Sequence, residues 1–250
     1  MTRSGHEGAP APGWEVRRER RADLALELWA RPGLAETTRE ALVRAGLERR
    51  GRRDGGGTVE LPGGSTAWVK GGRLTPKSGL RHGLRRLALG RPLPRHRELA
   101  NLTWLRARGL PAVEPLVAGV ARRGPRPVLQ FLATTLVPSA PSLADLAGHA
   151  DPDPARLVAA AGAVGSLLGR LHAVGFTHRD AFARNFVVDG SGRAWVLDAW
   201  RGGPGRSRPA RGAARDLADL EEDADRLLSP AAVQALRAAY DRAAGTAARA

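Results

Sequence analysis

The feature that most constrains this chain is a run of patterns in its second half. A helical pattern is followed by a polar loop and then by two short strand patterns joined by an Asp-Gly-Ser-Gly turn, at residues 157–172, 178–185, 186–188 and 194–197. The loop carries His178-Arg179-Asp180 and Asn185, and Asp198 follows the second strand. We therefore expect a loop and a hairpin end to present two carboxylates and one amide.

This order of residues resembles the protein-kinase-like superfamily, in which four residues separate H-R-D from an asparagine and a later strand ends in a metal-binding aspartate. The resemblance implies a bilobal α+β fold, ATP as phosphoryl donor and Mg²⁺ as cofactor. Such a transfer needs an acceptor hydroxyl held in line and a divalent metal at the phosphates. Asp180 would then accept or orient the hydroxyl proton, and Asn185 and Asp198 would bind Mg²⁺ through oxygen.

The first half holds residues that fit the same family. Ala67-Trp68-Val69-Lys70 resembles the superfamily's strand that ends in an ATP-binding lysine, and Glu98 lies on the next long helical pattern, at 94–109. Glu98 is the only acid between Glu60 and Glu114. We therefore predict an ion pair between Lys70 and Glu98 that belongs to the ATP site.

The segment 51–57 is rich in glycine but does not spell G-x-G-x-x-G. If this segment corresponds to the phosphate-covering loop of the superfamily, the backbone amides of Gly55, Gly56 and Gly57 would cover the ATP phosphates. A plain hairpin turn is the alternative for this cluster.

The remaining patterns suggest a mostly β first lobe and a mostly helical second lobe. Strand patterns lie at 58–61, 66–70, 113–120 and 128–136, and a last helix starts at Ser229-Pro230. Residues 14–45 fit one or two short helices broken near Pro32. We expect a tail and extension over 1–45, an N-terminal kinase lobe over 46–137 and a C-terminal kinase lobe over 138–250, with a hinge within 136–146.

The positive charge of the chain is concentrated in its first half. Residues 1–125 hold 25 Lys or Arg against 12 Asp or Glu, and residues 126–250 hold 15 against 13. Residues 61–113 hold eleven bases and a single acid, Glu98. Such a surface attracts phosphate in a nucleotide, a nucleic acid or an anionic membrane. A solvated face is the other interpretation of the arginine run at 81–108. Lys77, beside Pro76 and Ser78, is predicted on a solvated loop.

Composition narrows the class of protein further. The 250 residues include no cysteine, which excludes a disulfide scaffold. No window offers the eighteen uncharged apolar residues of a membrane span, because the best one, 157–176, contains Arg170 and His172. We expect no secretion signal and a cytoplasmic location.

The order and spacing of VKGGRL, SGLRHGLRRLALG, RHRELANLTWLRARGLPAVEPLVAGV, TTLVPSAPSLADL and VLDAWRGG resemble the bacterial lipopolysaccharide kinases, over about residues 50–228. The resemblance implies ATP-dependent phosphorylation of a sugar hydroxyl on the inner core attached to lipid A (3-deoxy-D-manno-octulosonic acid, Kdo). It places the chain at the cytoplasmic face of the inner membrane, with peripheral contact to its anionic surface.

Two departures from the superfamily pattern stand out. Asp198-Ala199-Trp200 replaces D-F-G, and Thr134-Thr135 stands where the superfamily often has an acid after a threonine. His178 is interpreted as a structural residue beneath the loop. Arg179 and Arg184 are open between supporting the loop and contacting phosphate.

Several alternatives stay open at this point. The chain could be another kinase of the superfamily, acting on an antibiotic, a different small molecule or a protein hydroxyl, or a pseudokinase with the altered D-A-W. A nucleic-acid-binding module is suggested by a net charge of +15. No helix-turn-helix, zinc or RNA-recognition signature accompanies that charge, so no specific nucleic-acid partner is expected.

Overall fold

We describe a computed structural model of the chain for residues 13–49, 55–89, 92–151, 153–205 and 209–247. The residues group into two compact units. The sheet unit takes the described residues up to Trp104 together with Glu114–Leu136, and the helical unit takes Leu105–Val113 and the described residues from Val137 onward.

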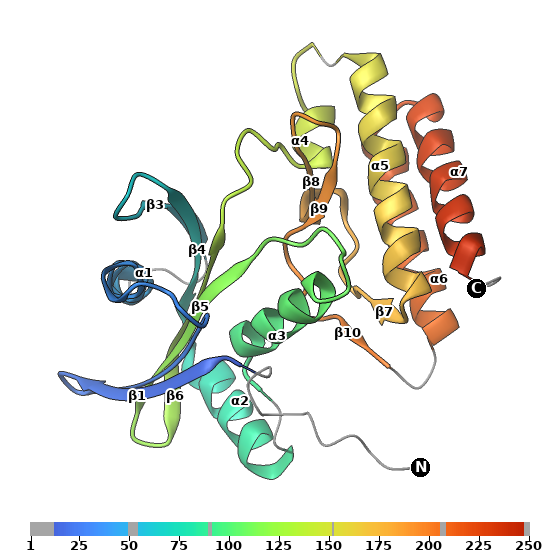
Figure 1. Cartoon of the computed structure of the whole chain (residues 1–250). Coiled ribbons are helices and arrows are strands. Elements are labelled where there is room, and N and C mark those ends of the chain that lie inside the picture. The colour runs from blue at the N-terminus through green and yellow to red at the C-terminus, as the bar shows by residue number, and fades with distance from the viewer. Residues whose placement is uncertain (1–12, 50–54, 90–91, 152, 206–208, 248–250) are drawn as a thin grey trace. The chain divides into compact units, whose positions relative to one another are not determined.

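The sheet unit is built on one antiparallel six-stranded sheet of order β1-β2-β5-β6-β4-β3. Its strands are β1 (Glu15–Arg21), β2 (Leu24–Ala30), β3 (Gly55–Glu60), β4 (Thr66–Arg73), β5 (Pro115–Arg123) and β6 (Arg126–Thr135). Three helices belong to the same part of the chain, namely α1 (Glu36–Glu48), α2 (Pro76–Leu89) and α3 (Pro94–Arg106). Figure 1 shows α1 and α3 on opposite faces of this sheet.

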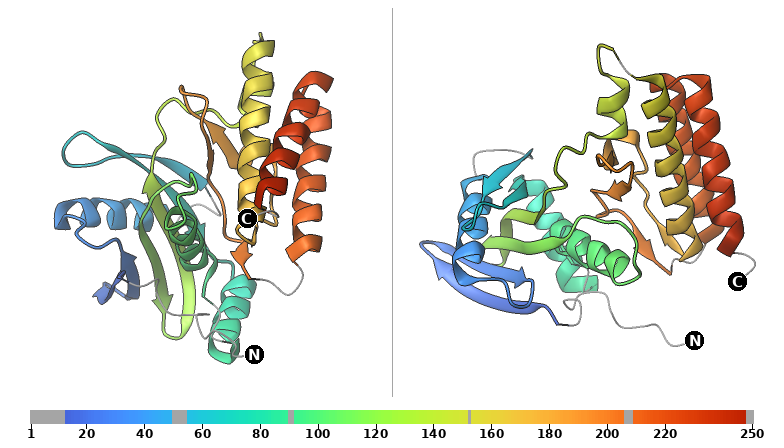
Figure 2. Two further views of the ribbon diagram at one scale, coloured as in Figure 1. Left: turned by 45° about the vertical axis from the view of Figure 1, so that its right-hand side comes forward. Right: turned by 45° about the horizontal axis from the view of Figure 1, so that its top comes forward.

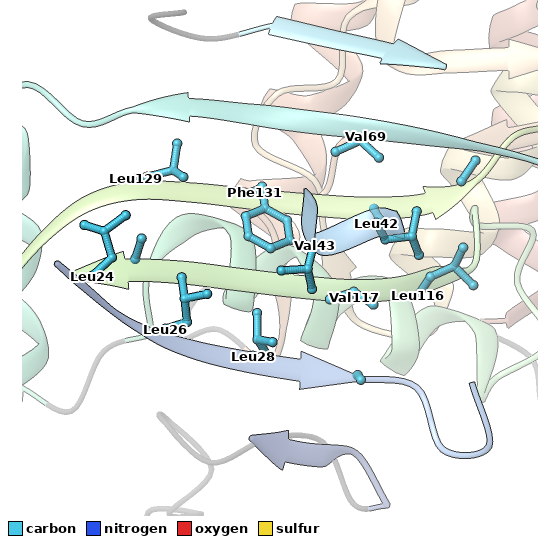
Figure 3. Close-up of a cluster of buried hydrophobic side chains, with 14 residues drawn as sticks. Leu24, Leu26, Leu28, Leu42, Val43, Val69, Leu116, Val117, Leu129 and Phe131 are labelled. Carbon is cyan, nitrogen blue, oxygen red and sulfur yellow. The ribbon is translucent and has the colours of Figure 1, made fainter. Parts of the chain in front are cut away.

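The core of the sheet unit lies between α1 and the sheet. Leu24, Leu26 and Leu28 of β2 point to this side, where they join Leu42 and Val43 of α1 (Figure 3). Trp29 faces the other way, and its ring stacks on His96 of α3 with centroids 4.1 Å apart. The alternation along β2 therefore fixes a helix to each face of the sheet.

Phe131 of β6 is fully buried at the centre of this core (Figure 3). A Cβ added at Gly46 of α1 would lie 2.4 Å from its ring, and one added at Gly119 of β5 would lie 2.2 Å from it. Both glycines are thus needed for the helix and the neighbouring strand to close around one aromatic ring.

The expectation of helices over 14–45 is wrong for its first part. Residues 15–30 form the hairpin β1–β2, and only α1 is helical. Leu24 and Leu28 fit a helical spacing, but Leu24, Leu26 and Leu28 also repeat every second residue, which is the strand period that the tertiary packing selects. The charged sequence EVRRERR of β1 suits an edge strand, because charges discourage pairing with further strands.

The helical unit contains α4 (Leu143–Ala147), α5 (Pro154–Ala173), α6 (Pro209–Leu227) and α7 (Pro230–Ala247). Short strands β7 (Phe176–Thr177) and β10 (Gly203–Pro204) pair, as do β8 (Phe186–Val188) and β9 (Ala194–Val196), and a 3₁₀ turn, η2, covers Ala183–Asn185. Asp153 caps α5 by accepting from the backbone of Ala155 and Arg156. The two views of Figure 2 show α5, α6 and α7 side by side.

Most elements of the second half were predicted near their observed bounds. These are α5 with Gly175 in the left-handed region (φ 75°), the hairpin β8–β9, and α7 after Ser229. The helix α6 was not predicted. Among the described residues, none of the helices has the length and apolar character needed to cross a bilayer.

Candidate active site

The loop after α5 is held in shape by its own polar groups. The backbone N–H of Phe182 donates to the carbonyl oxygen of Asp180 at 2.9 Å, and the N–H of Asn185 donates to Phe182 at 2.9 Å. The side-chain amide of Asn185 donates to the Asp180 carbonyl at 2.7 Å and to its carboxylate at 3.3 Å. Asp180 and Asn185 thus lie together on one rigid turn, as their spacing suggested.

Asp198 is brought to the same place by the hairpin β8–β9. Asn185 directly precedes β8, and Asp198 follows β9 after one residue. The N–H of Leu197 donates to the carbonyl of Asn185 at 3.1 Å. This bond extends the ladder beyond the strands and sets Asp198 beside the loop, so the helical unit gathers all three predicted residues.

The anchor of this loop is Asp216 of α6, a residue that the sequence analysis did not single out. Its carboxylate accepts the backbone N–H of His178 at 2.5 Å and that of Arg179 at 2.6 Å. Arg179 has φ 65°, which is an unfavourable region for a residue with a side chain. The two hydrogen bonds hold this conformation, and Asp180 follows directly from it.

Asp216 is fully buried, so its charge needs further partners. His172 of α5 lies with Nε2 3.2 Å from Asp216 and with Nδ1 2.9 Å from the hydroxyl oxygen of Tyr240 in α7. With the proton on Nε2, His172 donates to Asp216 and accepts from Tyr240. Three helices therefore share one polar network beneath the loop.

A second acid of α6 reinforces the loop farther along. Asp223, two helical turns beyond Asp216, accepts the backbone N–H of Ala183 at 2.8 Å. Asp216 and Asp223 lie seven residues apart and so share a helix face. Two acids seven residues apart on one helix face are the signal from which both could have been found, but α6 carries several other acids, so this signal is weak.

His178 is packed as a structural residue. It is fully buried, and its ring centroid lies 5.5 Å from that of Phe186. Burial lowers the pKa of His178 below its ordinary value of 6.5, although the nearby carboxylates of Asp216, Asp198 and Asp180 oppose the shift. The ring is therefore neutral at pH 7, which supports its interpretation as a packing residue beneath the loop.

In the sheet unit, Lys70 of β4 and Glu98 of α3 form the predicted ion pair. Glu98 is fully buried, and the side chain of Lys70 is 14% exposed. Arg95, one turn earlier on α3, also donates to Glu98 at 2.8 Å. The second cation was not predicted, and it means that Glu98 balances two charges in a buried place.

The glycine cluster does not form the hairpin turn that was the alternative for it. Gly55, Gly56 and Gly57 lie within β3, opposite Gly71, Lys70 and Val69. A Cβ at Gly56 would come within 2.2 Å of the ring of Trp68, so this position accepts no side chain without movement. Residues 51–54 of the same predicted segment lie outside the described part of the chain.

The loop and hairpin end fit a hard cation such as Mg²⁺. The amide nitrogen of Asn185 is committed to Asp180, which leaves its side-chain oxygen as the coordinating atom, and Asp198 adds a carboxylate. Within the residues that the structure describes, no three His, Cys, Asp or Glu side chains gather into a metal cluster. A cation bound here would complete its coordination with phosphate oxygens and water.

A positively charged side chain, that of Arg201, lies beside Asp180. The guanidinium of Arg201 is 3.4 Å from the Asp180 carboxylate and 5.0 Å from the centre of the Trp200 ring. The side chain of Arg201 is 53% exposed, and that of Asp180 is 16% exposed. Arg184 lies over the ring of Phe182 at 4.4 Å, and Arg179 is exposed.

The fold is shared with a solved structure. Among solved structures, "WaaP in complex with acyl carrier protein" matches with a TM-score of 0.50 and 21% identity, over 76% of each chain. This likeness shows that the chain has the protein-kinase-like fold, with a sheet-rich and a helical part.

The sequence model of the "Lipopolysaccharide kinase (Kdo/WaaP) family" matches residues 39–240, and the chain belongs to this family. A 3-deoxy-D-manno-octulosonic acid kinase of Stenotrophomonas maltophilia (strain R551-3) is 34% identical over 109 residues, which cover 42% of this chain and 40% of the relative. One of Xanthomonas axonopodis pv. citri (strain 306) is 30% identical over 162 residues, covering 61% and 59%. The chain thus matches less than two thirds of the length of these relatives.

We predict that Asp216→Ala loosens the loop. The buried N–H of His178 and the partly buried N–H of Arg179 would lose their acceptor, at a cost of about 1–3 kcal/mol for the buried group. Amide hydrogen exchange should become faster at His178 and Arg179, and the free energy of unfolding should fall. Asp225→Ala, an exposed acid on the same helix, is the matched control. Unchanged exchange in the loop of Asp216→Ala would show that the carboxylate is not the anchor.

We also predict a pH dependence of stability that comes from His178. Because its folded pKa is lowered from 6.5, the unfolded chain binds the proton more readily as the pH falls. The free energy of unfolding should therefore decline below pH 6.5, by at most about 1.4 kcal/mol per pH unit for this one group.

Denaturant titrations of wild type and His178→Leu between pH 5 and pH 8 would measure this slope. We expect the free energy of unfolding to decline less with falling pH in His178→Leu. The control His149→Leu, at an exposed histidine, should show the same decline as the wild type. Equal slopes in wild type and His178→Leu would rule out the buried ring as their source.

Proposed function

We propose that this chain is an ATP-dependent kinase that phosphorylates a sugar hydroxyl of the lipopolysaccharide inner core, on Kdo-lipid A. The reaction would take place at the cytoplasmic face of the inner membrane, on which the protein would be peripheral. The observation that carries the proposal is the rigid loop that presents Asp180 and Asn185, in a chain of the lipopolysaccharide kinase family. The names of the Kdo kinases that it resembles support the choice of acceptor.

The sheet unit would bind the nucleotide through Lys70. Its ammonium, oriented by Glu98, would contact the α- and β-phosphates, as the corresponding lysine does in protein kinases. Arg95 would keep Glu98 in place from the other side. The backbone of Gly55, Gly56 and Gly57 in β3 would lie over phosphate. A guanidinium would not replace the compact ammonium at Lys70.

The helical unit would carry out the transfer. Asp180 would accept the proton of the acceptor hydroxyl. At the same time the hydroxyl oxygen would form a bond to the γ-phosphorus, and the bond between that phosphorus and the leaving oxygen of ADP would break. Asn185 and Asp198 would hold Mg²⁺, which neutralises charge on the phosphate oxygens when bound. Asp216 acts on this step only by positioning the loop.

Arg201 favours an acidic acceptor over a neutral one. Its half-exposed guanidinium lies 3.4 Å from Asp180, where the acceptor hydroxyl would be held. An acidic sugar such as Kdo brings a carboxylate that pairs with a guanidinium through two hydrogen bonds. When the Arg201 guanidinium contacts the sugar carboxylate in place of Asp180, Asp180 is also left free to take the proton of the acceptor hydroxyl.

The direct experiment is to incubate the protein with labelled ATP, Mg²⁺ and Kdo-lipid A and to look for a product that carries one added phosphoryl group. Lipid A without Kdo is the matched control acceptor. Transfer to Kdo-lipid A alone supports the proposal. Transfer to an antibiotic, another small molecule or a protein, and none to Kdo-lipid A, would keep the kinase but reject this acceptor. Nucleotide binding without any transfer would indicate a pseudokinase.

We predict that Asp180→Ala lowers the rate of transfer by about 10²–10⁴-fold, the range attributed to a positioned general base. The affinity for ATP with Mg²⁺ should change little, because the nucleotide contacts lie on other residues. Rate and affinity would be measured on the same preparation, with Asp225→Ala as the control acid. Near-normal turnover in Asp180→Ala would remove it from the acceptor-facing role.

A further inference from the structure

Helix α2 of the sheet unit presents a continuous exposed face. Lys77, Leu80, Arg81 and Leu84 stand at positions i, i+3, i+4 and i+7, which share one side of a helix, and all four are exposed. Leu80 is 59% exposed and Leu84 56%, the two highest values among the large apolar side chains that the structure describes. Lys77 was expected on a loop, but it belongs to the first turn of this helix.

The opposite side of α2 is fixed against the sheet unit, beside β6 (Figures 1 and 2). A Cβ added at Gly79 would lie 2.5 Å from the carbonyl oxygen of Pro127, and one at Gly83 would lie 3.4 Å from the Pro127 ring. Only glycine allows this close approach at Gly79. The contact determines which side of the helix points outward, so the two leucines cannot simply turn inward.

The segment that carries this face is positively charged. Residues 61–113 contain one acid, Glu98, and that acid is buried against Lys70 and Arg95. Every exposed charged side chain that the structure describes in this segment is therefore basic. Two exposed leucines among bases form a short amphipathic face of the kind that lies in a membrane interface.

We propose that the exposed face of α2 docks on an anionic phospholipid bilayer. Leu80 and Leu84 enter the boundary between headgroups and acyl chains, and Lys77 and Arg81 contact lipid phosphates. This docking rests on the proposed function, because a kinase whose acceptor is anchored in a membrane has to reach that membrane surface. An acidic protein is the competing partner, but protein interfaces are usually centred on aromatic anchors, and this face has none.

The first test is cosedimentation of the full chain with vesicles of phosphatidylglycerol and phosphatidylcholine, compared with pure phosphatidylcholine. We expect binding to the anionic vesicles that weakens as salt is raised. The pair Leu80→Ser and Leu84→Ser should lower that binding by at least about tenfold. The pair Val174→Ser and Leu227→Ser, each 39% exposed in the helical unit, is the matched control and should bind as wild type does.

A second test reports where the contact lies. The chain has no cysteine, so Leu84→Cys and Val174→Cys each accept one polarity-sensitive fluorophore. We expect the emission of the label at position 84 to shift to shorter wavelength on anionic vesicles, with no shift at position 174. This readout does not depend on catalysis, so it separates failure of the docking surface from failure of the proposed kinase function.

Three results would overturn the proposal. One is that the chain does not bind anionic vesicles at all. Another is that the two leucine substitutions leave vesicle binding unchanged, which would indicate charge attraction alone. The third is a blue shift of the position-84 label with soluble poly-L-glutamate as large as with vesicles, which would point to an acidic protein partner.

Discussion

The geometry of the candidate site depends on one buried carboxylate. Asp216 accepts the N–H groups of His178 and Arg179, and through them it sets the loop from which Asp180 projects. A charge that is fully buried would be costly without such partners, and here the backbone amides and His172 provide them. The same bonds hold Arg179 in a conformation that it would otherwise leave. The packing of α5, α6 and α7 therefore fixes the position of the Asp180 carboxylate.

Local spacing was enough to predict much of this arrangement. Asp180 and Asn185 fall on one tight turn, and a two-stranded hairpin necessarily returns Asp198 toward the residue before its first strand. The pairing of Lys70 with Glu98 was predicted from the family resemblance, and the composition supports it, because the sequence between Glu60 and Glu114 holds no other acid. In each example the chain neighbours or the charge balance leave few arrangements to choose from.

The rest required tertiary contacts that leave a weaker mark in the sequence. In β2, Leu24 and Leu28 fit a helix and a strand equally well, and packing against α1 and α3 decides between them. Asp216 and Asp223 appear in the sequence as two acids among several on a helix rich in charge, and only their contacts with the loop distinguish them. Arg95 likewise could not be predicted as a partner of Glu98, because no local pattern shows that Glu98 is buried and needs a second cation.

We propose that Lys70 and Asp198 serve the binding of ATP, while Asp180 serves the acceptor. Calorimetric titration of a non-hydrolysable ATP analogue, with and without Mg²⁺, tests it most directly. We expect Lys70→Arg to weaken binding in both conditions, and Asp198→Ala to remove the gain in affinity that Mg²⁺ gives the wild type. Undiminished affinity in Lys70→Arg, together with an intact Mg²⁺ effect in Asp198→Ala, would contradict it.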